Sequence, residues 1–118
     1  MQNIEKWMQD FVYFWKKYEI NNVLSLFTQD VKYFESPFEN FWSFDEIAQA
    51  WEYIKTQKNI IFDYEIFSRE NEKYTIDWYL EYTNDAWEKN IWSGLYILKL
   101  NSENKCYFFK QVGEKNSF

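Results

Sequence analysis

Residues 23–38 read VLSLFTQDVKYFESPF, and this stretch decides the fold of the chain. A short apolar helix is expected to end at Phe27, and Asp30 is expected to open a strand. The strand carries Glu35 into a cluster of aromatic residues before it stops at Ser36-Pro37, because proline has no amide hydrogen to donate to a ladder. The stretch therefore predicts a helix-to-strand connection that presents one carboxylate.

The strand has two chemically different faces. Side chains alternate along a strand, so Val31, Tyr33 and Glu35 share one face. Lys32 and Phe34 lie on the other face. We therefore expect Glu35 to occupy the same side of the sheet as the apolar core.

Three helices are predicted in the first half of the chain. The first carries apolar residues at three- and four-residue spacing: Ile4, Trp7, Met8, Phe11, Trp15 and Tyr18. Asn21 or Asn22 can cap the second, short helix, which turns Val23, Leu26 and Phe27 inward. Ser43 and Glu46 form a capping box that starts the third helix near Phe44. The core positions of the third helix are Phe44, Ile47, Ala48, Trp51 and Ile54.

After Asn59 the apolar period drops from about 3.6 to two residues, which is typical of strands. Polar turns at residues 70–72, 84–85 and 101–104 separate four strands. The last two strands are expected at Ile91–Leu100 and Cys106–Val112. The pattern predicts an α+β fold in one domain, residues 1–118, that ends in a four-stranded antiparallel meander. Residues 113–118 are expected to form a mobile tail.

The composition fits one small domain with an excess of aromatic rings. A chain of 118 residues can bury one core, and 25% of its residues are Phe, Trp or Tyr. The excess rings can line a cavity or an oligomer interface. A genome rich in A and T would also favour Phe and Tyr codons, although it does not explain seven Trp.

The charge pattern excludes several classes of protein. The net charge is −6, and no basic stripe is present to neutralise phosphates, so nucleic-acid binding is not expected. No charged leader precedes an apolar run, and no run of about eighteen apolar residues occurs, so neither a signal peptide nor a membrane span is expected. Cys106 is the only cysteine and cannot form an intramolecular disulfide. We expect a cytoplasmic protein.

The chain contains no histidine, which restricts its chemistry. Ser-His-Asp and Cys-His catalysis are excluded, as is any His-ligated metal site. No metal, nucleotide or flavin motif is present, so no cofactor is expected. A general acid or base near neutral pH would have to be a carboxylate or a tyrosine with a shifted pKa, and less readily a lysine or Cys106.

The order of helix, short helix, strand, helix and meander resembles that of the nuclear transport factor 2-like superfamily, in particular its SnoaL-like branch of small bacterial proteins. The resemblance is sharpest at LFTQDVKYFESPF, residues 26–38, and IWSGLYILKL, residues 91–100. It implies a cone, in which a strongly curved antiparallel sheet wraps around the N-terminal helices and encloses a pocket. It also implies a homodimer through the sheet, since relatives commonly pair in this way.

The superfamily includes ketosteroid isomerases, and the resemblance places their functional positions on this chain. Asp30 takes the place of the strand-opening Asp, and Glu35 that of the isomerases' Asp base. Phe11 stands where the isomerases have a Tyr donor, and Tyr96 stands where they have a protonated Asp. One donor is thus lost, and the last strand, YFFKQV at residues 107–112, lacks the Arg-Glu-Trp-Trp-like ending of many SnoaL-like relatives. The complete isomerase mechanism is not expected here.

Glu35 and Tyr96 are the candidate catalytic residues. In an aromatic cavity, desolvation would raise the pKa of Glu35 into the range of a general base, although Glu35 can instead pair with a lysine or cap loop amides. Tyr96 can hold an oxyanion, or pack its ring and bond a backbone carbonyl. Gly94, two residues earlier, can open space for a ligand or permit a bulge.

Aromatic residues are expected to line the interior of the cone, either as a ligand site or as ordinary core. The expected ligand-binding residues are Phe11, Trp15, Tyr33, Trp51, Trp78, Trp92 and Gly94. Leu95 to Leu98 are apolar on both faces, which favours partial burial of the outer face in a homodimer.

Three functions remain open. The first is a cofactor-independent isomerase, cyclase or dehydratase that acts on a small apolar carbonyl compound through Glu35 and Tyr96. The second is a non-catalytic binder of a small apolar molecule. The third is a dimeric interaction module with an incidental cavity.

Overall fold

A computed structural model describes residues 3–35 and 42–116 of the chain. The elements follow in this order: α1 (Ile4–Lys16), α2 (Ile20–Leu24), β1 (Phe27–Phe34), α3 (Phe44–Trp51), the 3₁₀ helix η1 (Glu52–Thr56), β2 (Lys58–Glu70), β3 (Lys73–Thr83), β4 (Lys89–Leu100) and β5 (Cys106–Lys115). This is the predicted order of helices and strands. None of the described helices is long and apolar enough to cross a membrane.

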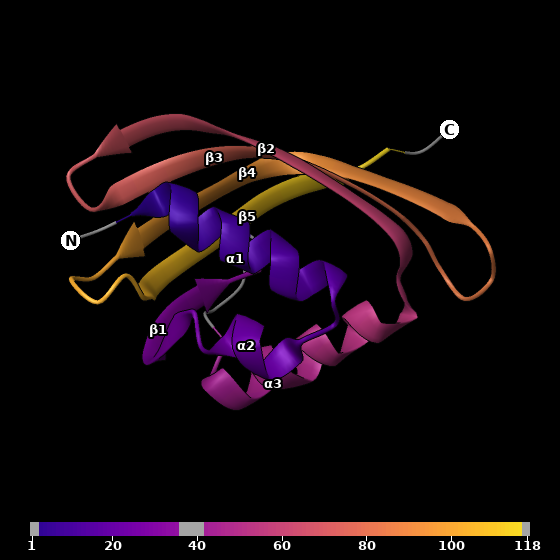
Figure 1. The fold of residues 1–118 in the computed structure, drawn as a ribbon, viewed down its shortest axis with the longest axis horizontal. Coiled ribbons are helices and arrows are strands. Elements are labelled where there is room, and N and C mark those ends of the chain that lie inside the picture. The colour runs from indigo at the N-terminus through magenta and orange to yellow at the C-terminus, as the bar shows by residue number, and fades with distance from the viewer. Residues whose placement is uncertain (1–2, 36–41, 117–118) are drawn as a thin grey trace.

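The five strands form one curved, open sheet in the order β1-β5-β4-β3-β2. Strands β2 to β5 are the predicted antiparallel meander, and β1 joins its edge in parallel with β5. The helices lie on the concave side of the sheet, so sheet and helices enclose an interior between them (Figure 1). The predicted α+β cone is therefore confirmed.

Helix α1 packs the predicted apolar stripe into this interior. Its N-cap is Asn3, whose side chain accepts a hydrogen bond from the Lys6 amide. The five stripe residues within the helix are buried: Ile4, Trp7, Met8, Phe11 and Trp15. Tyr18 was expected to continue the stripe, but it follows the helix with a positive φ of 58° and is 39% exposed. The hydroxyl of Tyr18 donates to the carbonyl of Gln57 instead, which ties the end of α1 to the start of β2.

The second helix begins earlier than predicted. Its N-cap is Glu19, which makes no side-chain capping bond, so neither Asn21 nor Asn22 caps it. The helix ends at Leu24, so Leu26 and Phe27, which were expected to belong to it, follow it in the chain.

Strand β1 begins at Phe27, three residues before Asp30. The reason is tertiary: the carbonyl of Leu26 accepts hydrogen bonds from the Cys106 amide at 2.8 Å and from the Trp7 indole at 3.1 Å. Phe27 then pairs with Cys106 at the start of β5. The inward face is as predicted, because Val31 and Tyr33 are only 4% and 3% exposed.

Helix α3 has the predicted capping box. The Ser43 hydroxyl accepts from the Glu46 amide, and the Glu46 carboxylate accepts from the Ser43 amide. Ile47 and Trp51 are buried in α3, and Ile54 is buried in η1. Ser36-Pro37, the predicted strand end, lies outside the described residues.

The C-terminal part of the chain is more ordered than expected. Gly113, Glu114 and Lys115 were assigned to a mobile tail, but they extend β5 and pair with Gly94, Ser93 and Trp92 of β4. These partners, residues 92–94, lie inside the strand predicted from Ile91. Strand β4 itself begins two residues earlier than predicted, at Lys89, which pairs with Thr83 of β3.

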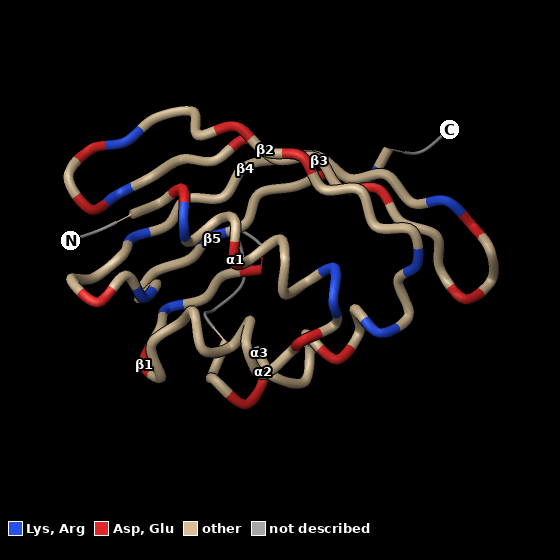
Figure 2. The backbone as a smooth tube through the Cα atoms, viewed as in Figure 1, with Lys and Arg blue, Asp and Glu red and all other residues tan. Residues whose placement is uncertain are grey.

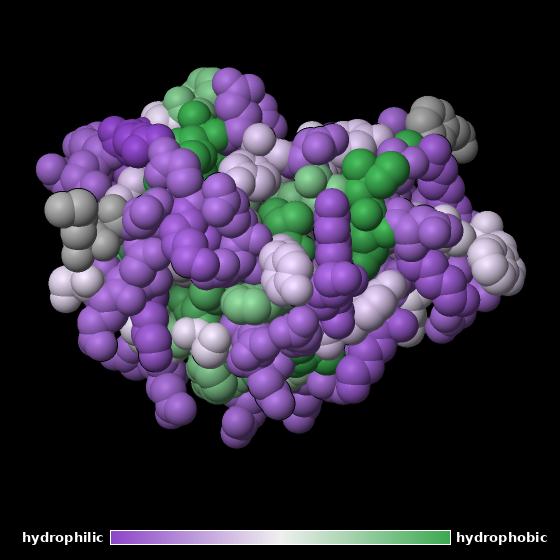
Figure 3. All heavy atoms as spheres, viewed as in Figure 1, coloured by the Kyte–Doolittle hydropathy of each residue, from purple (hydrophilic) through white to green (hydrophobic). Residues whose placement is uncertain are grey.

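Charged residues gather at the turns between strands and on the outward sides of the helices (Figure 2). On the face shown in Figure 3, polar side chains cover most of the surface and apolar ones show only in the spaces between them. Many aromatic residues are buried in the interior, whereas Tyr13, Tyr53, Phe67 and Trp87 are among those that are exposed.

Candidate functional site

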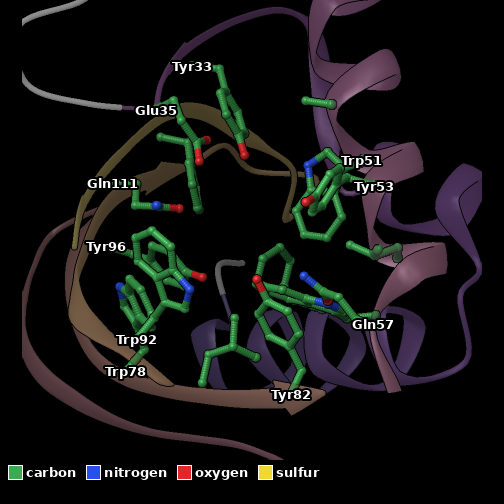
Figure 4. A pocket seen from close by; sticks show the side chains of 16 residues that line it. Tyr33, Glu35, Trp51, Tyr53, Gln57, Trp78, Tyr82, Trp92, Tyr96 and Gln111 are labelled. Atoms are coloured by element: carbon green, nitrogen blue, oxygen red, sulfur yellow. The ribbon is translucent and has the colours of Figure 1, made fainter. Parts of the chain in front are cut away.

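A cavity of about 250 Å³ lies between the concave face of the sheet and helices α1, α3 and η1 (Figure 4). Ten of its sixteen lining residues are aromatic: Phe11, Trp15, Tyr33, Trp51, Tyr53, Trp78, Tyr82, Trp92, Tyr96 and Phe109. The other six are Glu35, Ala50, Ile54, Gln57, Leu80 and Gln111. The wall is thus apolar, with few polar groups, as is usual for small-molecule sites.

The cavity brings together eight of the nine residues predicted for the site. They are Phe11, Trp15, Tyr33, Glu35, Trp51, Trp78, Trp92 and Tyr96. They come from α1, α3, β3, β4 and the end of β1, segments that only the folded sheet can place around one space.

Gly94 does not line this cavity. A Cβ at Gly94 would lie 1.9 Å from the carbonyl oxygen of Val112 and 2.6 Å from the Cα of Gly113. The pairing of β4 with β5 runs without a shift through Gly94, so this glycine does not mark a bulge. It permits the two backbones to approach each other closely.

Glu35 follows the last residue of β1 and is half-buried. Its carboxylate and the Tyr33 hydroxyl both point into the cavity from the same wall (Figure 4). Burial raises the pKa of Tyr33 well above its usual value, and the charge of Glu35 raises it further. The same two causes raise the pKa of Tyr96. The site thus joins one carboxylate with two phenols that stay protonated at neutral pH.

A second polar group in the wall comes from Gln57, which precedes β2. Its side-chain oxygen accepts a hydrogen bond of 2.7 Å from the Trp15 indole, and Gln57 is only 6% exposed. Burial raises the pKa of Tyr82, while hydrogen bonds with the side chains of Trp92 and Gln57 act in the opposite direction. Gln57 therefore connects α1 to the inner face of β3.

The Trp78 indole and the Cys106 thiol are two further buried polar groups. Trp78 is 3% exposed, and its indole N–H has no acceptor among the described residues. Cys106 is fully buried away from the cavity wall, and burial raises the pKa of its thiol, which stays protonated. Among residues 3–35 and 42–116, no group of three or more Cys, Asp or Glu side chains is placed to hold a metal ion.

Gln57, Tyr82 and Gln111 were not predicted as site residues. Tyr82 shares the inward face of β3 with Trp78, and Gln111 shares that of β5 with Phe109, so alternation could have identified both. Gln57 lies between η1 and β2, where no periodic pattern applies.

The two buried phenols predict how stability depends on alkaline pH. Unfolded tyrosines lose their protons near pH ~10, whereas Tyr33 and Tyr96 have a raised pKa when folded. Each phenol contributes fully to the free energy of unfolding below about pH 10. As the pH rises from there towards the pKa of the folded protein, this contribution falls by up to about 1.4 kcal/mol per pH unit for each group. Tyr33→Phe should reduce this slope, measured by urea unfolding between about pH 9 and 11.

Tyr53→Phe is the matched control, because Tyr53 lines the same cavity but is 67% exposed. It should leave the slope as in the unmodified protein. An unchanged slope in Tyr33→Phe would show that the Tyr33 phenol ionises in the folded protein as freely as in the unfolded chain.

The comparison with known proteins rests on structure alone. No protein-family model matches the sequence, and no curated protein matches it. An NTF2-like protein of unknown function from Exiguobacterium sp. 255-15 has a TM-score of 0.74 at 14% identity, over 92% of this chain and 98% of that one. A ketosteroid isomerase-like protein from Erwinia carotovora atroseptica has a TM-score of 0.72 at 16% identity, over 98% and 95% of the two chains.

A third similar structure is SalBIII, an epoxide hydrolase/cyclase-like enzyme of pyran ring formation in the polyether salinomycin. Its TM-score is 0.72 at 10% identity, over 97% of this chain and 95% of that one. These proteins share the nuclear transport factor 2-like fold with this chain, so the fold that the sequence resemblance implied is confirmed.

Proposed function

We propose that the cavity binds a small, largely apolar molecule and that Glu35 is its acid–base group. The observation that carries this proposal is the meeting of one carboxylate with two neutral phenols inside an aromatic wall. The volume of about 250 Å³ lies below the ~300–1,000 Å³ of drug-sized ligand sites. The ligand is therefore a molecule of one or two rings, or an open chain of similar size.

Acid–base catalysis is the more specific form of this function. Glu35 would accept a proton from the carbon beside a carbonyl, and Tyr96 would donate a hydrogen bond to the oxyanion that develops. An isomerase, a cyclase or a dehydratase can all use such a pair. The ketosteroid isomerase-like and cyclase-like structures support this class by sharing the scaffold, although a scaffold of this kind hosts many chemistries.

A non-catalytic binder is the alternative, and a homodimeric module is the third candidate. Leu95 and Val112 are paired on the outer face and are 37% and 40% exposed, which supports a contact there. The same row continues through Asp77 to Glu65, both exposed. These carboxylates would repel those of a second copy, which makes the dimer less favourable than a ligand site.

Filling the cavity should abolish binding. Leu80 lines the cavity and is 6% exposed, so Leu80→Phe places a ring in the ligand's space. We expect the affinity for small ketones such as phenylacetone, followed by tryptophan fluorescence, to fall at least about tenfold. Ile61→Phe, on the exposed face of β2, is the control and should bind normally. Equal affinity in the two variants would place the ligand elsewhere.

The same ketone separates catalysis from binding. Exchange of its α-hydrogens in deuterated water, followed by NMR, should be faster with the protein, and Glu35→Gln should lower that acceleration by about 10²–10⁴-fold. Glu65→Gln, a matched change on the outer face, should leave it unaltered. Binding without any acceleration would favour the non-catalytic alternative.

A further inference from the structure

We infer that the natural ligand carries a positive charge, as an ammonium group with small apolar substituents and a neutral oxygen nearby. This inference rests on the proposed function in one respect, namely that this cavity is the ligand site. It adds the chemical class of the ligand. Three features of the cavity lead to it.

The first feature is the charge of the wall. Among the described residues that line the cavity there is no Lys or Arg, and Glu35 is the one acidic residue. Tyr33 and Tyr96 are held in their neutral form, as described above. The carboxylate of Glu35 would repel an anionic ligand and attract a cationic one in a space of low dielectric constant.

The second feature is that the indole rings expose their faces, rather than their N–H groups, to the cavity. The Trp15 indole already donates to Gln57. The side chain of Trp51 lies beside the Tyr33 hydroxyl, and that of Trp92 lies beside the Tyr82 hydroxyl. The N–H groups of these three indoles are thus directed at other residues of the wall, and the indoles present their ring faces to a ligand. Ring faces attract cations, and tryptophan does so most strongly.

The aromatic rings surround the cavity from two sides, one formed by the helices and the other by the sheet. Trp15 of α1 and Trp51 of α3 lie 4.9 Å apart at 81°, so their planes are nearly perpendicular. On the sheet side, Trp78 and Tyr96 are stacked 5.1 Å apart at 19°. Figure 4 shows Trp51 across the cavity from Trp78, Trp92 and Tyr96. A compact cation between these walls would lie against several rings at once, as in the aromatic cages that bind quaternary ammonium groups.

The third feature is the indole N–H of Trp78. This donor is buried, belongs to a residue of the cavity wall and has no acceptor among the described residues. An unsatisfied buried donor is unfavourable by about 1–3 kcal/mol. A neutral hydroxyl, ether or carbonyl oxygen on the ligand would satisfy it after a turn of the indole ring towards the cavity, because the N–H has almost no accessible surface in this structure. An ammonium group cannot accept this hydrogen bond, because it has no lone pair. We therefore assign the ligand both an ammonium group and a neutral oxygen.

Two soluble probes of the same shape test the charge. Choline and 3,3-dimethylbutan-1-ol differ in one atom, a cationic nitrogen in place of a carbon, and both carry a hydroxyl. By isothermal titration calorimetry, choline should bind about tenfold or more tightly than the alcohol. Glu35→Gln should weaken choline binding by about tenfold and leave the affinity for the alcohol unchanged. Glu65→Gln, on the outer face, should change neither.

The outcomes separate the inference from the proposed function. If the alcohol binds as tightly as choline, or Glu35→Gln leaves choline binding intact, the ligand is not selected by charge and the inference fails while the cavity remains a binding site. If neither probe binds at millimolar concentration, but phenylacetone binds and Leu80→Phe blocks it, the inference also fails alone. If none of the three compounds binds, the inference and the proposed function fail together.

Discussion

Replacing Phe11 with alanine is expected to lower the free energy of unfolding by about 3–5 kcal/mol, the range for a large aromatic removed from a close-packed core. Phe11 is fully buried in α1. Its ring contacts six other aromatic rings: Trp7, Trp15, Trp51, Phe62, Tyr96 and Phe109. These rings come from α1, α3, β2, β4 and β5. Removing the central ring opens a hole that no single neighbour can fill.

Tyr13→Ala on the same helix is the control. Tyr13 is 55% exposed, so its loss should change the free energy of unfolding by less than about 1 kcal/mol. Both changes are measured by urea unfolding monitored by circular dichroism. If Phe11→Ala costs no more than Tyr13→Ala, the aromatic cluster is not the core that holds the helices against the sheet.

Gly94→Ala is the second change with a large expected effect. The new Cβ would lie 1.9 Å from the Val112 carbonyl oxygen, a distance that backbone atoms cannot tolerate. Strands β4 and β5 would have to separate where Gly94 pairs with Gly113. We expect a loss of about 3 kcal/mol or more in urea unfolding, at or above the upper end of ordinary overpacking.

Gly113→Ala provides a comparison within the same pair. Its Cβ would meet the Trp78 ring at 2.8 Å, and a side chain can move aside more easily than a backbone. We therefore expect a smaller loss of stability, together with a change in tryptophan fluorescence. A loss for Gly113→Ala equal to or larger than that for Gly94→Ala would contradict the close approach of β4 and β5.

The order of the elements could be predicted because each has a local signal. The apolar stripe from Ile4 to Trp15 has helical spacing, the Ser43–Glu46 pair is a capping box, and the residues after Asn59 alternate. These signals depend on near neighbours in the sequence, and they survive in the folded protein.

Several boundaries could not be predicted, because distant contacts set them. Phe27 enters β1 since Cys106 and Trp7 both bond to the carbonyl of Leu26. Tyr18 leaves the stripe of α1 since its hydroxyl reaches Gln57. Residues 113–115 join β5 because residues 92–94 of β4 pair with them. In each case the deciding bond joins residues far apart in the chain.

The candidate site was predictable to the extent that it follows alternation and helical spacing. Trp78 and Tyr96 could be assigned to the interior from their strands, and Trp15 and Trp51 from their helices. Gly94 was given a role in the cavity because its sequence position shows the missing side chain but not the neighbouring backbone. Gln57, between two elements, became visible only when the fold placed it beside Trp15.

A ligand site inside the cone is tested most directly by the indole N–H spectrum of the seven tryptophans during titration with choline or 3,3-dimethylbutan-1-ol. Single Trp→Phe variants assign the signals. We expect the signals of the four cavity tryptophans to shift: Trp15, Trp51, Trp78 and Trp92. Buried Trp7 and exposed Trp87, both outside the cavity wall, should stay in place. Shifts confined to Trp87, or no shifts with either compound at millimolar concentration, would contradict a ligand site inside the cone.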